Sequence, residues 1–262
     1  MRLPKIYLLI ATVLISGSTC GQENKGGNFV KKGTINENIE WTNTWVVGNN
    51  KHDLPKVLVI GDSHVNAYYP VLSDLLKDKT YLSKYTTSKC MGDPVFIEQL
   101  TWFLKSNKFD VISINNGLHG IAFTLEQYAG DLRVVYRLFK KYQPKAKLIW
   151  VYTTARRKPQ RILELDSLNQ QVLERNKVIS TFAAEKRIPL ADLYFISSEH
   201  PEYYHHDGIH FKPEGISEEA KKLKDLILKA LEPPGASIQN ESAAIRRTTD
   251  RSIGHKDVVN KP

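Results

Sequence analysis

The chain has 262 residues, of which 41% are hydrophobic and 25% are charged. These are the values of an ordinary globular protein, long enough for one large domain with a well-buried core. Its 37 basic and 28 acidic residues leave a formal net charge of +9, but Arg156-Arg157-Lys158 is the nearest thing to a basic cluster. We therefore predict a generally basic surface and no nucleic-acid partner.

The first 20 residues have the pattern of an export signal. Arg2 and Lys5 precede an apolar segment, Ile6–Ile15, that is too short to span a bilayer comfortably. Small residues then lead to Cys20, which lies where a bacterial lipoprotein signal carries its lipidated cysteine, although Thr19 is unusual before it. We expect a periplasmic or cell-surface protein that meets the membrane only through this lipid anchor, with simple secretion as the alternative.

Composition divides the rest of the chain into three parts. Residues 21–50 are rich in Gly, Asn and Lys and are expected to be a tether or N-terminal arm. Within them, Trp41 and Trp45 are expected to pin the arm to the domain or to form a platform for a sugar. Residues 51–232 hold the predicted domain, and residues 233–262 form a polar tail without apolar periodicity, which we expect to be disordered.

Short apolar runs in this domain alternate with segments of helical spacing. The helical pattern is clearest over 125–139 and 216–231. Such alternation is typical of parallel strands joined by right-handed crossovers, with helices on both faces. We therefore predict an α/β fold, a three-layer α/β/α sandwich around a parallel sheet of about five strands. The expected strands are Val57–Ile60, Thr80–Tyr85, Val111–Ile114, Leu148–Tyr152 and Ile188–Leu193.

Two motifs carry the chemistry. Gly61-Asp62-Ser63 follows the first buried strand and opens a helix, where free N–H groups favour developing negative charge. The alternative, purely structural role for Ser63 at this position is that of a helix cap. Far downstream, Asp207-Gly208-Ile209-His210 offers a carboxylate and an imidazole. A serine becomes a useful nucleophile when it has such a base, itself oriented by an acid.

Together the two motifs resemble the SGNH/GDSL hydrolase family, which has G-D-S after its first strand and D-x-x-H near its C-terminus. The resemblance covers roughly Leu54 to Leu231 and implies the flavodoxin-like SGNH hydrolase fold. It also implies a catalytic triad in which Ser63 is the nucleophile, His210 the general base and Asp207 the orienting acid. No cofactor is implied.

The resemblance further implies donors for an oxyanion. These are the backbone N–H of Ser63, a glycine N–H matched by Gly92, and a side chain after the third strand. The family pattern there is G-x-N-D, and the register falls on Gly117-Leu118-His119-Gly120, so His119 takes the place of the asparagine. An imidazole can donate an N–H as well. The alternatives for this donor are Asn115 and Asn116.

Other residues near the motifs are candidates for contacts with the substrate. Arg156 and Arg157 follow the fourth strand, and one of them is a candidate for binding an anionic group of the substrate; the alternative is a solvated loop charge. Candidates for substrate contact or packing are His64 and Tyr204. A metal site formed by His205 and His206 with the D-x-x-H motif is a further alternative. It leaves the serine without a role, so we predict no metal.

These features predict an exported serine esterase that forms an acyl-enzyme and releases it to water. Export and the supply of aromatic residues favour an O-acetyl group on a carbohydrate as the substrate. Within the same fold, the alternatives are a lipid or small-ester hydrolase and an acyltransferase. The alternatives of another class are a non-catalytic surface lipoprotein that binds glycan and a metal-dependent hydrolase.

Overall fold

The computed structural model describes residues 36–233. The predicted export signal, Cys20, the first part of the tether and residues 234–262 of the tail lie outside the described residues. Among the described residues, no helix has the length and apolar character needed to cross a membrane.

The core of the domain is a six-stranded sheet in the order β1-β3-β2-β4-β5-β8. Five strands run parallel, and β1 pairs antiparallel with β3 at one edge. The parallel strands thus have the flavodoxin-like order, and the predicted three-layer fold is confirmed. The strands are β1 (Thr42–Trp45), β2 (Lys56–Gly61), β3 (Tyr81–Thr87), β4 (Val111–Ile114), β5 (Lys147–Val151) and β8 (Leu190–Ala191).

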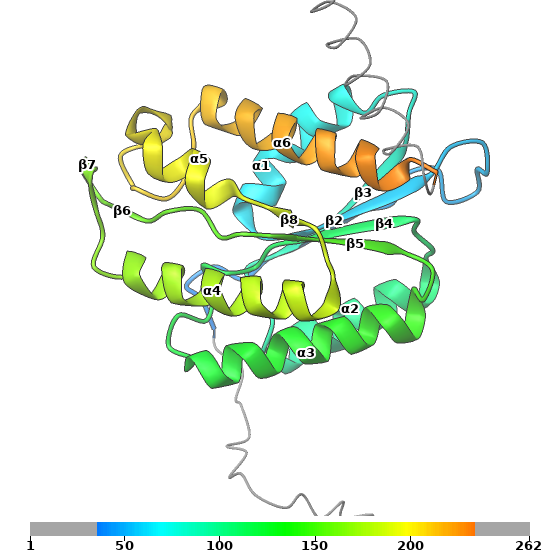
Figure 1. Ribbon diagram of the computed structural model, residues 1–262, viewed down its shortest axis with the longest axis horizontal. Helices are drawn as coiled ribbons and strands as arrows, with labels where there is room; N and C mark the ends of the chain where they lie inside the picture. The colour runs from blue at the N-terminus through cyan, green and yellow to red at the C-terminus, as the bar shows by residue number, and fades with distance from the viewer. Residues whose placement is uncertain (1–35, 234–262) are drawn as a thin grey trace, which may run out of the picture. The chain divides into compact units, whose positions relative to one another are not determined.

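Helices cover both faces of this sheet (Figure 1). Successive side chains of a strand point to opposite faces, so Val57 and Val59 of β2 pack on one side while Leu58 and Ile60 pack on the other. The first face is covered by α1 (Ser63–Leu75), α5 (Leu193–Glu199) and α6 (Pro213–Leu231). The second face is covered by α2 (Pro94–Ser106), α3 (Leu125–Tyr142) and α4 (Asn169–Lys186).

Polar caps set where the first helices begin. The Asp62 side chain accepts the His64 N–H and caps α1, so Ser63 is the first residue of that helix. Asp93 caps α2 by accepting the Val95 N–H, and a capping box formed by Thr124 and Gln127 opens α3. The first of these caps matters most for function, because it holds Ser63 at the carboxyl end of β2.

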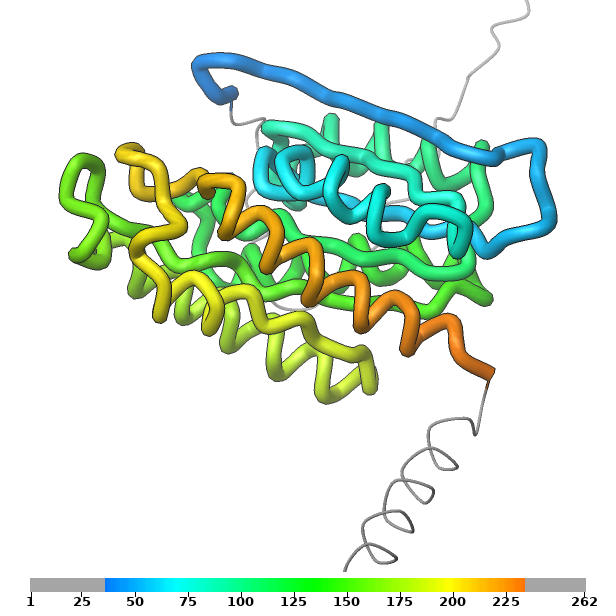
Figure 2. Tube along the Cα trace, turned by 90° about the horizontal axis from the view of Figure 1, so that it is seen from above, coloured from blue at the N-terminus to red at the C-terminus, as the bar shows by residue number. Residues whose placement is uncertain are grey.

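The predicted tether needs correction at Thr42–Trp45. These four residues form β1, the edge strand of the sheet (Figure 2), instead of a free linker. The backbone of Trp41 continues the attachment through two hydrogen bonds with Ser88. Trp45 is 62% exposed. Strand pairing therefore holds this part of the arm, and the Trp45 ring contributes little.

A hairpin that the sequence patterns do not predict lies between β5 and α4. Its strands are β6 (Arg157–Lys158) and β7 (Arg161–Leu165), which pair antiparallel. A 3₁₀ turn, η1 (Pro201–Tyr203), follows α5. Both lie in the connections that reach the carboxyl edge of the sheet.

The sheet order places the GDS motif at a switch point. The chain continues from β2 to β3 on one side, and then crosses to β4 on the other side of β2. In open α/β sheets the connections diverge at such a point and leave a crevice at the carboxyl ends of the strands. Ser63 follows β2 directly and therefore lies at that crevice.

Gly61 provides a test of this packing. A Cβ on Gly61 would lie 2.2 Å from a methyl carbon of Val65 and 2.5 Å from the backbone oxygen of Asn115. We expect Gly61→Ala to lower the free energy of unfolding by about 1–3 kcal/mol, the usual cost of overpacking. Denaturant unfolding measures this. The matched control is Gly130→Ala in α3, where nothing lies within 4 Å and a gain of about 0.5–1 kcal/mol is expected. Equal stability of Gly61→Ala and the wild type would contradict the packing.

Candidate active site

The structure brings together the serine, histidine and aspartate predicted from the two motifs. Ser63 Oγ lies 2.9 Å from Nε2 of His210, and His210 Nδ1 lies 2.7 Å from Oδ2 of Asp207. The serine belongs to the first turn of α1, whereas the other two side chains come from the loop before α6. This chain of hydrogen bonds is the arrangement in which an imidazole can take a proton from a serine hydroxyl.

Asp207 also organises its own loop. Its Oδ1 accepts hydrogen bonds from the backbone N–H groups of Ile209 and His210, each at 2.9 Å. Although partial burial opposes ionisation, the hydrogen bonds from the His210 ring and from these two N–H groups hold the pKa of Asp207 below its usual range. The ionised carboxylate accepts a hydrogen bond from the N–H group at His210 Nδ1, which leaves Nε2 as the acceptor facing Ser63.

The β6–β7 hairpin braces this loop from the side. Arg157 N–H donates to the Gly208 carbonyl at 2.9 Å, and Gln160 N–H donates to the His206 carbonyl at 2.7 Å. Gly208 has a φ of +73°, and a Cβ there would lie 2.2 Å from the Arg157 oxygen. Only glycine fits so close an approach, so the central glycine of the D-G-I-H motif has a structural reason.

The Arg157 side chain fixes the hairpin in turn. Its guanidinium is buried and donates to the carbonyls of Ile162, Ser197 and Ser198, and it lies over the ring of Tyr204. The only sequence signal was a pair of adjacent arginines, which suggested an anion contact and not a buried brace.

Asn116 is the best placed of the three candidates for the side-chain oxyanion donor. It follows β4, and its Nδ2 donates to the Lys89 carbonyl, just after β3, at 2.9 Å. Because β2 lies between β3 and β4, this hydrogen bond crosses the end of β2, where Ser63 lies. Asn116 is buried, and its Nδ2 carries a second hydrogen.

The other two candidates point elsewhere. Asn115 Nδ2 donates to the Val151 carbonyl of β5, away from β3. His119 Nδ1 lies 3.1 Å from a carboxylate oxygen of Glu37 in the N-terminal arm. These contacts favour Asn116 over the other two candidates, and the identity of the oxyanion donor stays a prediction. Gly92 lies in a turn closed by a hydrogen bond from Asp93 N–H to the Cys90 carbonyl, directly before α2.

Arg175 of α4 holds the loop after β4. Its guanidinium is 1% exposed and donates to the carbonyls of Gly117, His119 and Gly120 at 2.6–2.9 Å. It also lies 4.7 Å from the centre of the Tyr128 ring. No motif marks this residue, which the sequence analysis missed.

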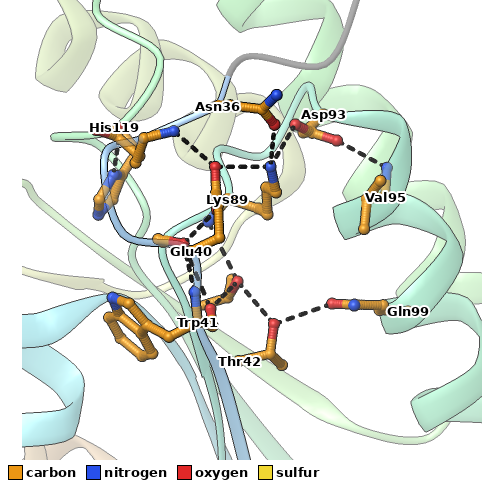
Figure 3. A network of polar contacts seen from close by, with 12 residues as sticks. Asn36, Glu40, Trp41, Thr42, Lys89, Asp93, Val95, Gln99 and His119 are labelled. Carbon is orange, nitrogen blue, oxygen red and sulfur yellow. Dashed lines mark hydrogen bonds and ion pairs between the residues drawn. The ribbon is translucent and has the colours of Figure 1, made fainter.

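The N-terminal arm closes over the same loops through the network drawn in Figure 3. Lys89 Nζ lies 2.8 Å from Glu40 Oε1, 3.0 Å from Asn36 Oδ1 and 3.7 Å from Asp93 Oδ2. Glu40 Oε2 also accepts from the Ser88 hydroxyl at 2.6 Å. The arm thereby ties together the turn that carries Gly92 and, through Glu37, the loop after β4.

Two of the predicted substrate contacts are corrected by burial. Tyr204 has no exposed surface, and its hydroxyl donates to the Ala155 carbonyl at 2.6 Å. His64 is 6% exposed and is paired with Glu219. Both are packing residues behind the triad. Arg156 is partly exposed and lies 3.6 Å from Asp166, so its role in binding substrate stays a prediction.

The histidines next to the triad do not assemble a metal site. Within residues 36–233, no group of three or more His, Cys, Asp and Glu side chains has the arrangement that holds a metal ion. His205 contributes backbone bonds instead: its N–H donates to the His210 carbonyl, and its carbonyl accepts from Gly208.

Solved structures resemble this fold at low sequence identity. A GDSL-like lipase from Bacteroides thetaiotaomicron has 19% identity and a TM-score of 0.53, over 68% of this chain and 89% of that one. An acetyl xylan esterase has 16% identity and a TM-score of 0.55, over 66% and 99%. An acetylxylan esterase from Geobacillus stearothermophilus has 15% identity and a TM-score of 0.50, over 67% and 93%. No protein-family model and no curated protein sequence matches the chain.

The structure thus has a three-layer α/β/α fold, with aligned Ser, His and Asp side chains and the serine at the switch point of the sheet. This is the fold of the solved SGNH/GDSL hydrolases. The resemblance predicted from the G-D-S and D-x-x-H motifs is confirmed at this level.

The Arg175 clamp leads to a prediction for stability. Arg175→Met keeps the length of the side chain but leaves three carbonyls of the 117–120 loop without their donor. We expect the free energy of unfolding to fall by at least about 2 kcal/mol, since one unsatisfied buried group costs about 1–3 kcal/mol. Arg133→Met, at an exposed arginine of α3, is the control and should change stability little. Denaturant unfolding of both compares them, and equal values would refute the clamp.

The Glu40–Lys89 pair leads to a prediction for pH. Burial opposes ionisation of Glu40, but its hydrogen bonds and the nearby charge outweigh this effect and lower its pKa from 4.5 to about 2. The hydrogen bonds come from Lys89, Ser88 and the Glu37 backbone, and the charge is that of Lys89. The folded value lies below the unfolded one, so this stabilisation is present above about pH 4.5 and is lost as the pH falls toward 2. We expect wild-type stability to decline more than that of Glu40→Gln across this window. Parallel urea titrations at several pH values measure it, and identical declines would count against the pair.

Proposed function

We propose that this protein is a serine esterase that uses Ser63, His210 and Asp207 as a catalytic triad. The observation that carries the proposal is the unbroken chain of hydrogen bonds from Ser63 Oγ through the imidazole to Asp207. A helix-capping serine has no need of such a partner. Here Asp62 caps α1, so the Ser63 hydroxyl is not needed as a helix cap.

The geometry accounts for each proton. As Ser63 Oγ attacks the ester carbon, its proton moves to His210 Nε2 and the carbonyl electron pair moves onto oxygen. The tetrahedral intermediate collapses, the bond to the alkoxide breaks, and His210 returns the proton to that leaving group. A water molecule then attacks the carbonyl carbon of the acyl-enzyme and gives a proton to His210. The second tetrahedral intermediate collapses, the bond between that carbon and Ser63 Oγ breaks, and His210 returns the proton to Ser63 Oγ as the carboxylic acid is released. Asp207 stabilises the transient imidazolium.

The oxyanion needs donors on the other side of the ester carbon. Our proposal assigns them to the backbone N–H groups of Ser63 and Gly92 and to the second hydrogen of Asn116 Nδ2. The position of Asn116 across the end of β2 supports this assignment. Each such donor is typically worth about a hundred- to a thousandfold in rate.

For the substrate, we propose an O-acetyl group on a carbohydrate. The side chains of His210 and Asp207 are each 48% exposed, so the triad lies open to solvent. An open triad suits a small acyl group carried by a polymer better than a long chain that needs a deep apolar cavity. Two of the similar structures are named acetyl xylan esterases. The export pattern at the N-terminus, with Cys20 as the lipid anchor, agrees with a glycan outside the cytoplasm.

Hydrolysis of a chromogenic acetyl ester tests the mechanism. We expect Ser63→Ala to lower kcat by at least about a thousandfold. The control Ser73→Ala makes the same change on the same helix and should keep the wild-type rate. A fluorophosphonate should label Ser63, as shown by mass spectrometry, and a chelator should not alter turnover. Acetate release from acetylated xylan then tests the substrate class, with added acceptor sugars to detect acyl transfer.

Two results would contradict the proposal in different ways. Equal turnover by the wild type and Ser63→Ala would remove the serine mechanism. No turnover on simple esters or acetylated glycans, together with no fluorophosphonate labelling, would favour a protein that binds glycan without catalysis.

A further inference from the structure

A buried acid and a buried histidine lie directly behind the triad. Glu219 of α6 has no exposed surface, and His64 of α1 is 6% exposed. His64 Nδ1 lies 3.2 Å from Glu219 Oε1, and Glu219 Oε2 has no hydrogen-bond partner among the described residues. Burial of a carboxylate is costly even when it is paired, and such a pair is poor evidence for stability as such. The position of the Glu219–His64 pair therefore needs an explanation other than stability.

The ring of His64 touches the catalytic loop along several of its sides. It stacks on the His210 ring, with centroids 6.1 Å apart and planes 19° apart. The Phe211 ring lies nearly perpendicular to it, with centroids 5.0 Å apart, and the Ile209 backbone makes a hydrogen bond to it that favours its charged form. Its Nε2 also lies 3.4 Å from the Thr154 hydroxyl, after β5. Three successive residues of the catalytic loop, 209–211, thus rest on one imidazole.

The charge of this imidazole depends on its neighbours. Although burial opposes the charged form, the Glu219 carboxylate, Asp62 and the Ile209 backbone raise the pKa of His64 to about 9. Burial in turn raises the pKa of Glu219 above its usual range. The other titratable groups nearby are His210 on the loop, Tyr68 of α1 and Tyr204 before the loop. The protonated ring can donate from both nitrogens, to the carboxylate and to the loop.

We infer that the His64–Glu219 pair is a positioning device for the triad, which holds the 209–211 segment so that the His210 ring stays within reach of Ser63. This inference rests on the proposed serine esterase function and adds two residues to it. Neither residue touches the substrate. Glu219 orients His64, and His64 supports the loop through its stacking and hydrogen bonds.

The role predicts a particular kinetic signature for Glu219→Gln. The amide keeps the shape and an acceptor but removes the charge that favours a protonated His64. If His64 then loses its proton, the loop loses a hydrogen-bond donor. If His64 keeps its proton, its uncompensated positive charge lies next to the imidazolium that His210 forms in the reaction. Either change acts on the proton transfer and not on substrate binding.

We therefore expect kcat on the acetyl ester to fall about ten- to a hundredfold, the scale of a misplaced reacting group, with KM within about twofold of wild type. The acidic limb of the pH profile of kcat/KM should also move, because it reports ionisation of the free enzyme. The matched control is Glu218→Gln, the same change at the adjacent α6 residue, whose carboxylate pairs with Lys221 at the surface. It should keep both the wild-type rate and the wild-type pH profile.

A second measurement needs neither catalysis nor a folded Glu219 variant. In an NMR titration of the Ser63→Ala chain, the His64 ring should stay protonated beyond pH 8, and its loss of the proton should shift the His210 resonances. Release of the His64 proton near its ordinary pKa of 6.5 without an effect on His210 would overturn the inference, whether or not Glu219→Gln folds.

The outcomes separate the inference from the function it rests on. If the wild type and Ser63→Ala hydrolyse the ester equally, the serine mechanism fails. If the wild type is active through Ser63 and Glu219→Gln matches it in kcat and in pH profile, the mechanism stands and the positioning role is wrong.

Discussion

The carboxyl edge of the sheet depends on one constraint: a backbone carbonyl buried there has no water to bind and is stabilised by a donor from the protein. Arg175 meets this constraint by binding three carbonyls of the loop after β4, and Arg157 by binding three carbonyls around α5 and the hairpin. Asn116 joins the ends of β4 and β3 in the same way. The loop after β4 and the β6–β7 hairpin are thus each held by the buried guanidinium of an arginine.

Sequence patterns could predict the strands and the triad because both are local signals. A run such as Val57–Ile60 is apolar throughout, since a parallel strand is buried on both faces, and G-D-S and D-x-x-H are contiguous motifs. The buried side chains that hold the loops in place, such as Arg175, Arg157 and Glu219, gave no comparable signal. Glu219 lies on the apolar stripe of α6 with Ile216, Ala220 and Leu223, so an acid that interrupts such a stripe is the clue that could have identified it. Its partner lies 155 positions away, and no helical spacing can pair them.

The edge strand β1 shows a second limit of local reasoning. Residues 42–45 lie in a polar, Asn-rich stretch, and their exposure agrees with the expectation of a linker. Their hydrogen bonds to β3 come from the backbone, which any sequence supplies, and the ion pairs of Glu40 with Lys89 and of Lys89 with Asp93 lie next to them. Neither the backbone pairing nor these contacts between residues far apart in the sequence can be recognised from a polar stretch alone.

The contacts of the loop after β4 give a physical reason for the departure from the G-x-N-D pattern. In this chain the imidazole at that register is turned toward Glu37, and its carbonyl is bound by Arg175, so the residue serves to attach the arm. Asn116, three residues earlier, instead reaches across β2 toward the turn that carries Gly92. The proposed function allows this exchange, because an oxyanion donor is specified by where its N–H lies and not by its place in a motif. At 15–19% identity, the chain shares with the similar structures the fold and not the sequence, so its function has to be argued from the site.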